Sequence, residues 1–575
     1  DSEEEGDGGG DGDGGEDDLE GLVGEILNGE IDREAAAAGA SHSAVDVLLG
    51  DAFEPIVIED KRPAAECEDG HEHAEAGNPE ELMQWLIAPM ELDNFMAHVW
   101  ERRPMYISRN AHKGYYDGWL SKANIDEWLR SGKMRYGSNV DITSYKAGVR
   151  KTHNANLDGT GGVDAHTGQP GMADADSVWH RFDNEGCSLR VLHPQRWRDP
   201  LWKMLSTLER FWKCSTGCNC YLTPADSQGF APHYDDIDAF ILQLEGKKSW
   251  KVYAPRCTDE MLPRFSSPNF SQSRDDIGLP VLEVVLEAGD VLYMPRGTIH
   301  QAACVPGAHS LHVTLSTNQF NTWADVLELA IPAALRAAVA ELPALRRCPP
   351  PDMLDHLGLA SQKGEEEGGE VDNPRRDAFI GVLTELAAAV MRRLPLDSAA
   401  DQLGKRLMQQ RLPPPPSHLS AAASKSGAAA AAKLKQSSVV RLMQEGGARV
   451  MVEDDRAVVY HSFANPRLEH MEGGEDDVDE VGEEEEKAGK ETSEVKGEEK
   501  DAKGKGKEEE EVVEEKDEPG KLSFDLDCGP ALEALLHAED AAEEGVMVKD
   551  LPLPKQERLE MVRRLVEARV LAVVK

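Results

Sequence analysis

The chain has 575 residues, and its 62 lysines and arginines against 107 aspartates and glutamates give a formal net charge of −45 at pH 7. This length exceeds one ordinary domain, and this charge disfavours free nucleic acid as a partner for the whole chain while favouring a basic protein. Nine cysteines without regular spacing exclude a disulfide framework, and no secretory leader or bilayer-spanning apolar run is visible, so we expect a soluble intracellular protein.

The first 78 residues are expected to form a mostly disordered, acidic region. Residues 1–18, DSEEEGDGGGDGDGGEDD, carry too little apolar surface to offset the entropy of ordering. Short helices are predicted over 19–27 and 44–53, followed by a loose linker over 61–77. Potential metal ligands occur in that linker, namely Cys67, His71 and His73. Their acidic neighbours favour a solvated tract over a metal site.

Folded sequence is predicted to begin near Pro79. The stretch PEELMQWLIAPMELDNFMAHVWERRPMYISR has the spacing of two amphipathic helices and a strand that starts at Met105. A helix is predicted over 121–129, and strands over 136–149 and 187–193 flank a glycine-rich loop. No helix with Lys-Ser/Thr follows that loop, so we interpret it as a surface loop and not as a phosphate-binding one.

A helix predicted over 200–212 precedes the strand CNCYLTP. Alternation along this strand places Asn219, Tyr221 and Thr223 on one face. The cysteines in and before the strand lack a second ligand pair at zinc-site spacing, so they are interpreted as packed thiols.

The segment GFAPHYDDIDAFILQLEGKKSWKVYAP is the most informative stretch of the chain. Alternate side chains of an extended strand share a face, so His233 and Asp235 are expected to point the same way. A strand, a turn at 245–247 and a second strand follow, and on that second strand Lys248 shares a face with Trp250. Because burying a lysine is costly without an anionic partner, Lys248 is a candidate anion-binding residue. The alternative is a surface lysine whose charged end reaches water.

The later segment VLEVVLEAGDVLYMPRGTIHQAACV predicts a strand, a Gly-Asp turn, a strand, a Pro-Arg-Gly turn and a further strand that carries His300. The sequence SLHVTLSTNQF at 310–320 adds another strand. Many short strands separated by turn signals predict a jelly-roll or cupin-like barrel. There His300 can join His233 and Asp235 in a set of two imidazoles and one carboxylate, which suits non-haem Fe(II).

These segments, together with YLTPADSQGFAPHYDD and SLHVTLSTNQFNTW, closely resemble the JmjC-type ribosomal oxygenases, in the branch of nucleolar histidyl-hydroxylases and lysine-specific demethylases. The likeness runs from about Pro79 to the C-terminus, interrupted by low-complexity inserts. It implies a mixed fold, in which a JmjC double-stranded β-helix barrel is followed by an α-helical dimerisation domain and a C-terminal winged-helix domain, with acidic disordered segments. The implied boundaries are 79–322 for the oxygenase region with its core at about 187–322, 323–412 for the helical domain, and 413–575 for the winged helix with an acidic insert at 473–520.

The resemblance also assigns roles to individual residues. It implies that the catalytic iron ligands are His233, Asp235 and His300. It implies that 2-oxoglutarate is held by Lys248, Tyr221 and Asn219. Two further positions match residues near the substrate groove of the family, namely Arg190 and Ser316. A fourth ligand at His312 is not expected, because the open metal positions are needed for chemistry.

The implied function is Fe(II)- and 2-oxoglutarate-dependent hydroxylation of a histidine in a large-subunit ribosomal protein. Two alternatives stay open: demethylation of methyl-lysine in a histone H3 tail by the same oxidation, and a non-catalytic binding protein of ribosome assembly or chromatin. The resemblance further implies a homodimer in the nucleus, and within it the nucleolus. Glutamates dilute the arginines of the last predicted helix, so direct nucleic-acid binding is not expected.

Overall fold

The chain divides into two compact units, Asp1–Asn321 and Thr322–Lys575. The computed structural model describes residues 53–162, 171–271, 277–358, 374–421, 425–471, 518–536 and 545–575. Within these stretches, no helix combines the length and the apolar character that crossing a membrane requires. The helices predicted over 19–27 and 44–53, and nearly all of the acidic insert at 473–520, lie outside the described residues.

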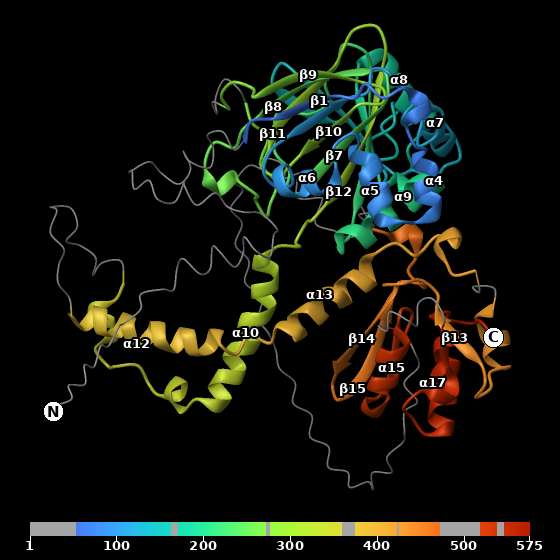
Figure 1. Cartoon of the computed structure of the whole chain (residues 1–575). Coiled ribbons are helices and arrows are strands. Elements are labelled where there is room, and N and C mark those ends of the chain that lie inside the picture. The colour runs from blue at the N-terminus through green and yellow to red at the C-terminus, as the bar shows by residue number, and fades with distance from the viewer. Residues whose placement is uncertain are drawn as a thin grey trace, which may run out of the picture. The chain divides into compact units, whose positions relative to one another are not determined.

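Two β-sheets form the body of the first unit (Figure 1). The larger sheet has nine strands in the order β1 (Ile56–Glu59), β2 (Met105–Ser108), β10 (Val291–Met294), β7 (Asp238–Glu245), β12 (Ser310–Thr317), β6 (Gly217–Thr223), β5 (Ser188–Leu192), β3 (Val140–Lys146) and β4 (Val149–Thr152). The smaller sheet has the order β11 (Ile299–Cys304), β8 (Lys247–Tyr253) and β9 (Leu282–Glu287). Apart from β1 and β2, which run parallel, the paired strands are antiparallel, as expected for a jelly-roll barrel.

Alternating apolar side chains hold the two sheets face to face. Tyr106, Ile241 and Leu292 of the larger sheet pack in one buried cluster with Trp250 and Leu286 of the smaller one. Along β8, residues 248, 250 and 252 are buried while 247, 249 and 251 are more exposed, which confirms the predicted alternation. The barrel interior is therefore the face on which Lys248 lies.

Helices cover this body of the first unit. They are α4 (Gly70–Ala76), α5 (Pro79–Ile87), α6 (Leu92–His98), α7 (Lys122–Arg130), α8 (Ala175–Glu185) and α9 (Asp199–Trp212). Figure 1 shows α4, α5 and α9 side by side, and these helices contact one another. The helices predicted over 121–129 and 200–212 are thereby confirmed as α7 and α9.

The prediction of a loose linker over 61–77 was wrong, and folded structure begins before Pro79. Helix α4 lies in that stretch, with the Asp69 side chain accepting from the first turn and Gly77 in the left-handed conformation at the end. The imidazole of His71 stacks on Trp119, with ring centroids 4.1 Å apart. Composition alone missed this helix because its apolar support comes from an aromatic residue far along the chain.

A second difference concerns the strand predicted over 136–149. Strand β3 ends at Lys146, and a turn at Ala147 and Gly148 leads into β4. Both turn residues have positive φ, 51° and 78°, a conformation that glycine adopts without strain. The chain therefore forms a hairpin where one strand was expected.

The second unit begins with long helices, namely α10 (Trp323–Glu341), α12 (Pro374–Met391) and α13 (Leu396–Gln410), with the short α11 (Met353–His356) between the first two. Ala334, Ala338 and Val390 form a small buried cluster where α10 meets α12. The helical period predicted for this region is thus confirmed.

The rest of the second unit consists of two small antiparallel sheets with helices packed on them. One sheet has the order β14 (Ala448–Glu453), β15 (Arg456–His461) and β16 (Lys521–Asp525), and the other β17 (Val546–Met547), β13 (Val439–Leu442) and β18 (Leu571–Val573). Helices α14 (Ala428–Ala431), α15 (Gly529–Leu536) and α17 (Lys555–Glu567) share a buried apolar cluster with them.

Candidate metal centre

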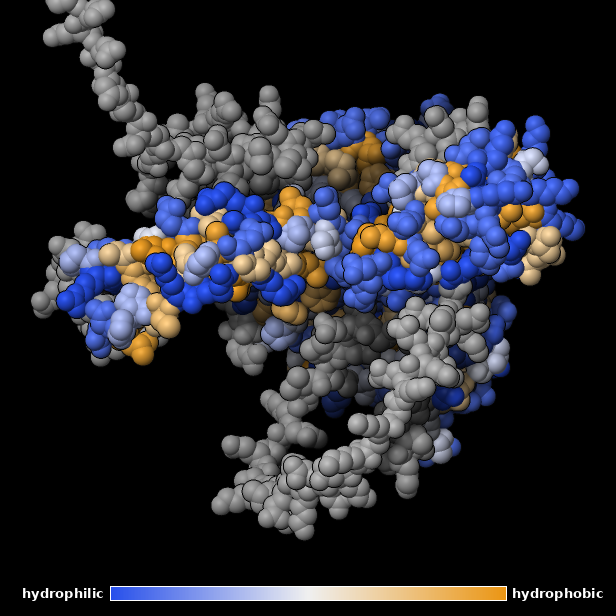
Figure 2. Space-filling view, turned by 90° about the horizontal axis from the view of Figure 1, so that it is seen from below, coloured by the Kyte–Doolittle hydropathy of each residue, from blue (hydrophilic) through white to orange (hydrophobic). Residues whose placement is uncertain are grey.

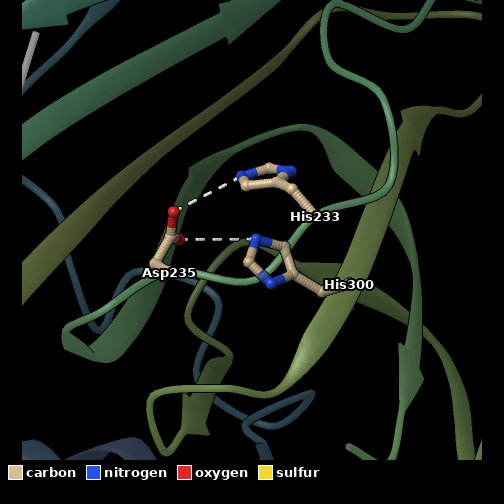
Figure 3. A group of neighbouring side chains, drawn as sticks. All are labelled: His233, Asp235 and His300. Atoms are coloured by element: carbon tan, nitrogen blue, oxygen red, sulfur yellow. Dashed lines mark ion pairs between the residues drawn. The ribbon is translucent and has the colours of Figure 1, made fainter. Parts of the chain in front are cut away.

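Two imidazoles and one carboxylate meet inside the first unit (Figure 3). One ligand atom from each of His233, Asp235 and His300 lies within 4.8 Å of the others. The Nε2 atom of His233 is 3.5 Å from Oδ1 of Asp235, and Nε2 of His300 is 3.7 Å from Oδ2 of the same carboxylate. Among the described residues this is the only group of three such side chains.

The backbone around these ligands differs from the expectation in one respect. His300 lies in β11 as predicted, but His233 and Asp235 precede β7 in a segment without regular strand structure. A two-way backbone bridge ties this segment to β11: His233 N donates to His300 O at 3.2 Å, and His300 N donates to His233 O at 2.8 Å. Both side chains of the His-x-Asp pair nevertheless face the same point (Figure 3).

Hydrogen bonds orient each imidazole for metal binding. Nδ1 of His233 lies 2.9 Å from the carbonyl of Ala231, and Nδ1 of His300 lies 3.0 Å from the carbonyl of Thr298. A carbonyl oxygen only accepts, so each Nδ1 carries the proton and each Nε2 presents its lone pair toward Asp235. Burial, and then the neighbouring His233, lower the pKa of His300, which keeps this imidazole neutral and able to ligate.

This donor set fits a non-haem iron site. Two imidazoles and a carboxylate on one side of a point leave the opposite positions open, which is the arrangement that non-haem Fe(II) oxygenases use. No cysteine belongs to the group, so the thiolate-rich surroundings of a structural zinc site are absent from the described ligands.

A buried cation lies on the barrel face of β8. The side chain of Lys248 is almost fully buried, and its Nζ donates to Thr223 Oγ1 at 3.2 Å and lies 5.7 Å from the ring centroid of Trp250. No described carboxylate forms an ion pair with it. Burial lowers the pKa of Lys248 to about 8, an effect that the nearby thiols of Cys304 and Cys220 partly offset.

The neighbouring strands add a polar row to the same face. Arg190 of β5 pairs in register with Tyr221 of β6, and Tyr221 with His312 of β12. The rings of Tyr221 and His312 stack with centroids 5.0 Å apart, and His312 lies edge-on to Trp250 at 5.4 Å. Burial, then the charge of Lys248, hold the pKa of His312 well below its usual range, so this ring is neutral.

Several buried polar atoms on this face have no hydrogen-bond partner in the described part of the chain. They are Oδ1 of Asn219, Nε1 of Trp250 and Nδ1 of His312. Unsatisfied buried groups are rare in folded proteins, and together with Lys248 they are suited to a polar, anionic ligand. No cofactor role was predicted from the sequence for Thr223, Trp250 or His312. The alternation of CNCYLTP was the available signal for Thr223, since it places that residue beside Asn219 and Tyr221.

The two residues expected near the substrate groove have different surroundings. Arg190 donates from Nε and Nη2 to Asp141 Oδ2 at 3.0 and 2.7 Å. Ser316 is half-buried near the end of β12, in register with Gly217 of β6. Their roles toward a substrate stay predictions.

Comparison with known proteins identifies this barrel. Residues 190–326 match the family described as JmjC domain. The chain is 46% identical over 334 residues to the bifunctional lysine-specific demethylase and histidyl-hydroxylase NO66 of Culex quinquefasciatus, covering 58% of this chain and 48% of that protein. It is 41% identical over 401 residues to ribosomal oxygenase 1 of Homo sapiens, covering 68% and 59% respectively. Residues 190–326 therefore carry a JmjC domain, and the chain around them is similar to proteins named as ribosomal oxygenases.

These matches differ in how much of each protein they cover. This JmjC protein spans about half the length of the curated relatives it matches. The solved structure of the Escherichia coli ribosomal oxygenase YcfD in complex with cobalt and 2-oxoglutarate is 15% identical, covers 85% of this chain and 99% of that one, and superposes with a TM-score of 0.35.

Proposed function

We propose that this JmjC protein is an Fe(II)- and 2-oxoglutarate-dependent protein hydroxylase that acts on a histidine of a large-subunit ribosomal protein. The observation that carries the proposal is the pairing of two features in one barrel. A set of two imidazoles and one carboxylate lies on one side, and the buried cation of Lys248, which has no described carboxylate partner, lies on the neighbouring strand. A metal-chelating dicarboxylate requires both features together.

Each feature has a separate role in the proposal. His233, Asp235 and His300 would hold Fe(II), which supplies oxygen activation when it is bound with 2-oxoglutarate. Lys248 and Thr223 would bind the distal carboxylate of 2-oxoglutarate, because an ammonium and a hydroxyl are its natural donors. Tyr221 and Asn219 lie on the same face and would line the co-substrate.

The class of substrate is inferred from charge and from the relatives. A chain with a net charge of −45 attracts basic proteins by long-range steering, and ribosomal proteins and histone tails are both basic. The Culex relative is named as both a lysine-specific demethylase and a histidyl-hydroxylase. Demethylation of a histone H3 lysine is therefore the second candidate function.

The third candidate is a binding protein without catalysis. In such a protein, one or more of the metal ligands, or Lys248, would be expected to be lost. All three ligand residues are present and converge, and Lys248 is present and buried. This completeness favours an enzyme over a binding protein that retains only the barrel.

Mass spectrometry distinguishes the candidates directly. The protein is incubated with Fe(II) and 2-oxoglutarate, in parallel with a histidine-containing ribosomal-protein peptide and a methylated histone H3 peptide. A gain of one oxygen on histidine supports hydroxylation. Loss of a methyl group from lysine without any histidine product would replace the proposal by demethylation, and a Lys248→Ala variant assayed at low 2-oxoglutarate serves as the control.

We also propose that the long helices of the second unit bind a second copy of the chain. Along α10, Leu327, Ile331, Leu335 and Val339 are spaced by four residues and are each between 37% and 46% exposed. Spacing by four places them along one stripe of the helix, beside the stripe of the buried alanines Ala330, Ala334 and Ala338. Figure 2 shows apolar residues gathered between polar ones along these helices. A Leu335→Asp variant should sediment as a monomer where the native chain sediments as a dimer.

The C-terminal part of the second unit is proposed to contact protein and not DNA. The arginines of α17 are already engaged: Arg558 donates to the carbonyl of Lys549, Arg563 pairs with Glu560, and Arg564 donates to the carbonyl of Ser523. A base-reading helix needs free cationic side chains.

We also propose that the protein is located in the nucleus, and within it in the nucleolus, where a ribosomal-protein substrate would meet it before assembly. Imaging of a fluorescent fusion tests this location.

A further inference from the structure

The metal ligands lie on two segments that are far apart in sequence. Asp235 precedes β7, and His300 follows the turn at 295–298 that joins β10 to β11. This turn touches the ligand segments at two points. Gly297 N donates to Asp235 O at 3.0 Å, and the carbonyl of Thr298 accepts from Nδ1 of His300 at 3.0 Å. The position of the turn therefore determines where the carboxylate and the imidazole stand relative to each other.

A buried ion pair holds this turn against the start of β7. Nη1 of Arg296 lies 2.6 Å from Oδ2 of Asp238, and both side chains are buried. The hydroxyl of Tyr293 donates to the other carboxylate oxygen of Asp238 at 3.0 Å. Asp238 follows Asp235 by three residues, and Arg296 precedes His300 by four. The pair thus connects the two ligand-bearing segments immediately beside their ligands.

The same guanidinium has a second carboxylate partner. Nη1 of Arg296 also lies 2.6 Å from Oε1 of Glu101, whose side chain is 34% exposed. Glu101 belongs to a turn that carries no metal ligand. Two carboxylates therefore contact one nitrogen, but only Asp238 connects Arg296 to the metal centre, which provides an internal control.

Stability alone is a weak reason to bury this pair. An ion pair taken out of water gains little over well-packed apolar side chains of the same volume, whereas a fixed pair of charges does define one geometry. Gly297 shows how closely the turn is fitted: its φ is +85°, and a Cβ there would lie 2.0 Å from the carbonyl oxygen of Glu260. Few other positions of this turn would keep both its contact with Asp235 and its contact with His300.

We propose that Arg296 and Asp238 are positioning residues for the metal centre, holding the Asp235 carboxylate and the His300 imidazole at the separation that one metal ion requires. This inference rests on the proposed iron site and deepens it. Neither residue belongs to the group of three side chains that would hold the metal. Outer partners of metal ligands change metal affinity about 10- to 100-fold when they are removed, and a loss of about 10-fold is expected here because the effect passes through the backbone.

The test measures Co(II) binding, which needs no turnover. Isothermal titration gives the affinity, and the ligand-field absorption of the Co(II)-saturated protein reports the coordination geometry. Asp238→Asn keeps the side-chain shape but loses one of its two hydrogen bonds, and Arg296→Met keeps the length but loses the charge. Both should bind Co(II) about 10-fold more weakly and show an altered absorption spectrum at saturation. Arg296→Lys should restore part of the affinity.

Glu101→Gln is the matched control. This substitution removes the negative charge of Glu101, which contacts the same guanidinium nitrogen of Arg296 but lies outside the segments that carry the metal ligands. The Co(II) affinity and the absorption spectrum of this variant should therefore stay native. If Arg296→Met does not fold, Asp238→Asn against Glu101→Gln decides the question. Equal affinity and identical spectra in these two variants would overturn the positioning role alone. A native protein that bound no Co(II) would refute the metal site and this inference with it.

Discussion

Two buried cations of the first unit have opposite surroundings. Lys248 on β8 has a hydroxyl and an aromatic ring beside it and no described carboxylate, whereas Arg296 has carboxylates of Asp238 and Glu101 on one nitrogen. A buried charge without a counter-charge is unfavourable in the free protein. In the proposed function, the distal carboxylate of 2-oxoglutarate supplies the missing charge. The comparison thus distinguishes Lys248, which is proposed to bind a ligand, from Arg296, which is proposed to hold the fold around the site.

The largest effect is expected from a substitution in the metal site itself that leaves Lys248 and Arg296 in place. His233→Ala removes one of three ligands, so co-substrate turnover should fall by at least about 10³-fold, a barrier increase of roughly 4 kcal/mol. Lys248→Ala should instead raise the KM for 2-oxoglutarate while preserving more of kcat. Succinate release measured against 2-oxoglutarate concentration checks both. Equal losses of kcat in the two variants would contradict the assignment of Lys248 to co-substrate binding.

Stability should change in opposite directions when each cation is replaced by methionine. Arg296→Met leaves the buried Asp238 without its partner and should cost about 3 kcal/mol. Lys248→Met should stabilise the free protein at pH 7 by about 1 kcal/mol or more, because the lowered pKa of Lys248 shows that the fold disfavours its charged form below about pH 8. Urea unfolding of the metal-free protein measures both values. Destabilisation by Lys248→Met would show that the lysine has an anionic partner within the chain.

The charge of Lys248 should make co-substrate binding depend on pH. Its pKa of about 8 lies below the ordinary value of a lysine, and only the protonated amine attracts a carboxylate. Affinity for 2-oxoglutarate should therefore be full below pH 8 and fall above it, approaching about 10-fold per pH unit. Titration of the Co(II)-loaded protein with 2-oxoglutarate at several pH values measures this. The Lys248→Arg variant should show no such fall, since arginine stays protonated.

The smallest effect tests the one hydrogen bond described for the lysine. Thr223→Val keeps the shape of the side chain and removes the hydroxyl that accepts from Lys248 Nζ at 3.2 Å. Loss of such a bond is worth about 1 kcal/mol, so the KM for 2-oxoglutarate should rise about five-fold with kcat nearly unchanged. Steady-state kinetics beside a Ser249→Ala control, on the other face of β8, isolates the effect. An unchanged KM would show that Thr223 does not help to place the amine.

The alternation of side chains along strands and the turn residues between them were sufficient to predict the parts of the fold that depend on neighbouring residues. The alternation of KSWKVYAP placed Lys248 and Trp250 on the buried face of β8, and the turn residues between β9 and β11 marked the strand that carries His300. Helix α4 was missed because its support, Trp119, lies far along the chain. His233 and Asp235 were expected on a regular strand, yet the bridge to His300 orients that segment.

The residue types able to bind a metal and a dicarboxylate were thus readable from the chain alone, since side-chain chemistry and strand periodicity are properties of neighbouring residues. The folded barrel was needed to show that Thr223 reaches Lys248, that His312 stacks on Tyr221, and that Arg296 pairs with Asp238. These contacts depend on the register between strands that are distant in the chain. Register is set by the packing of the whole barrel, and no local pattern contains it.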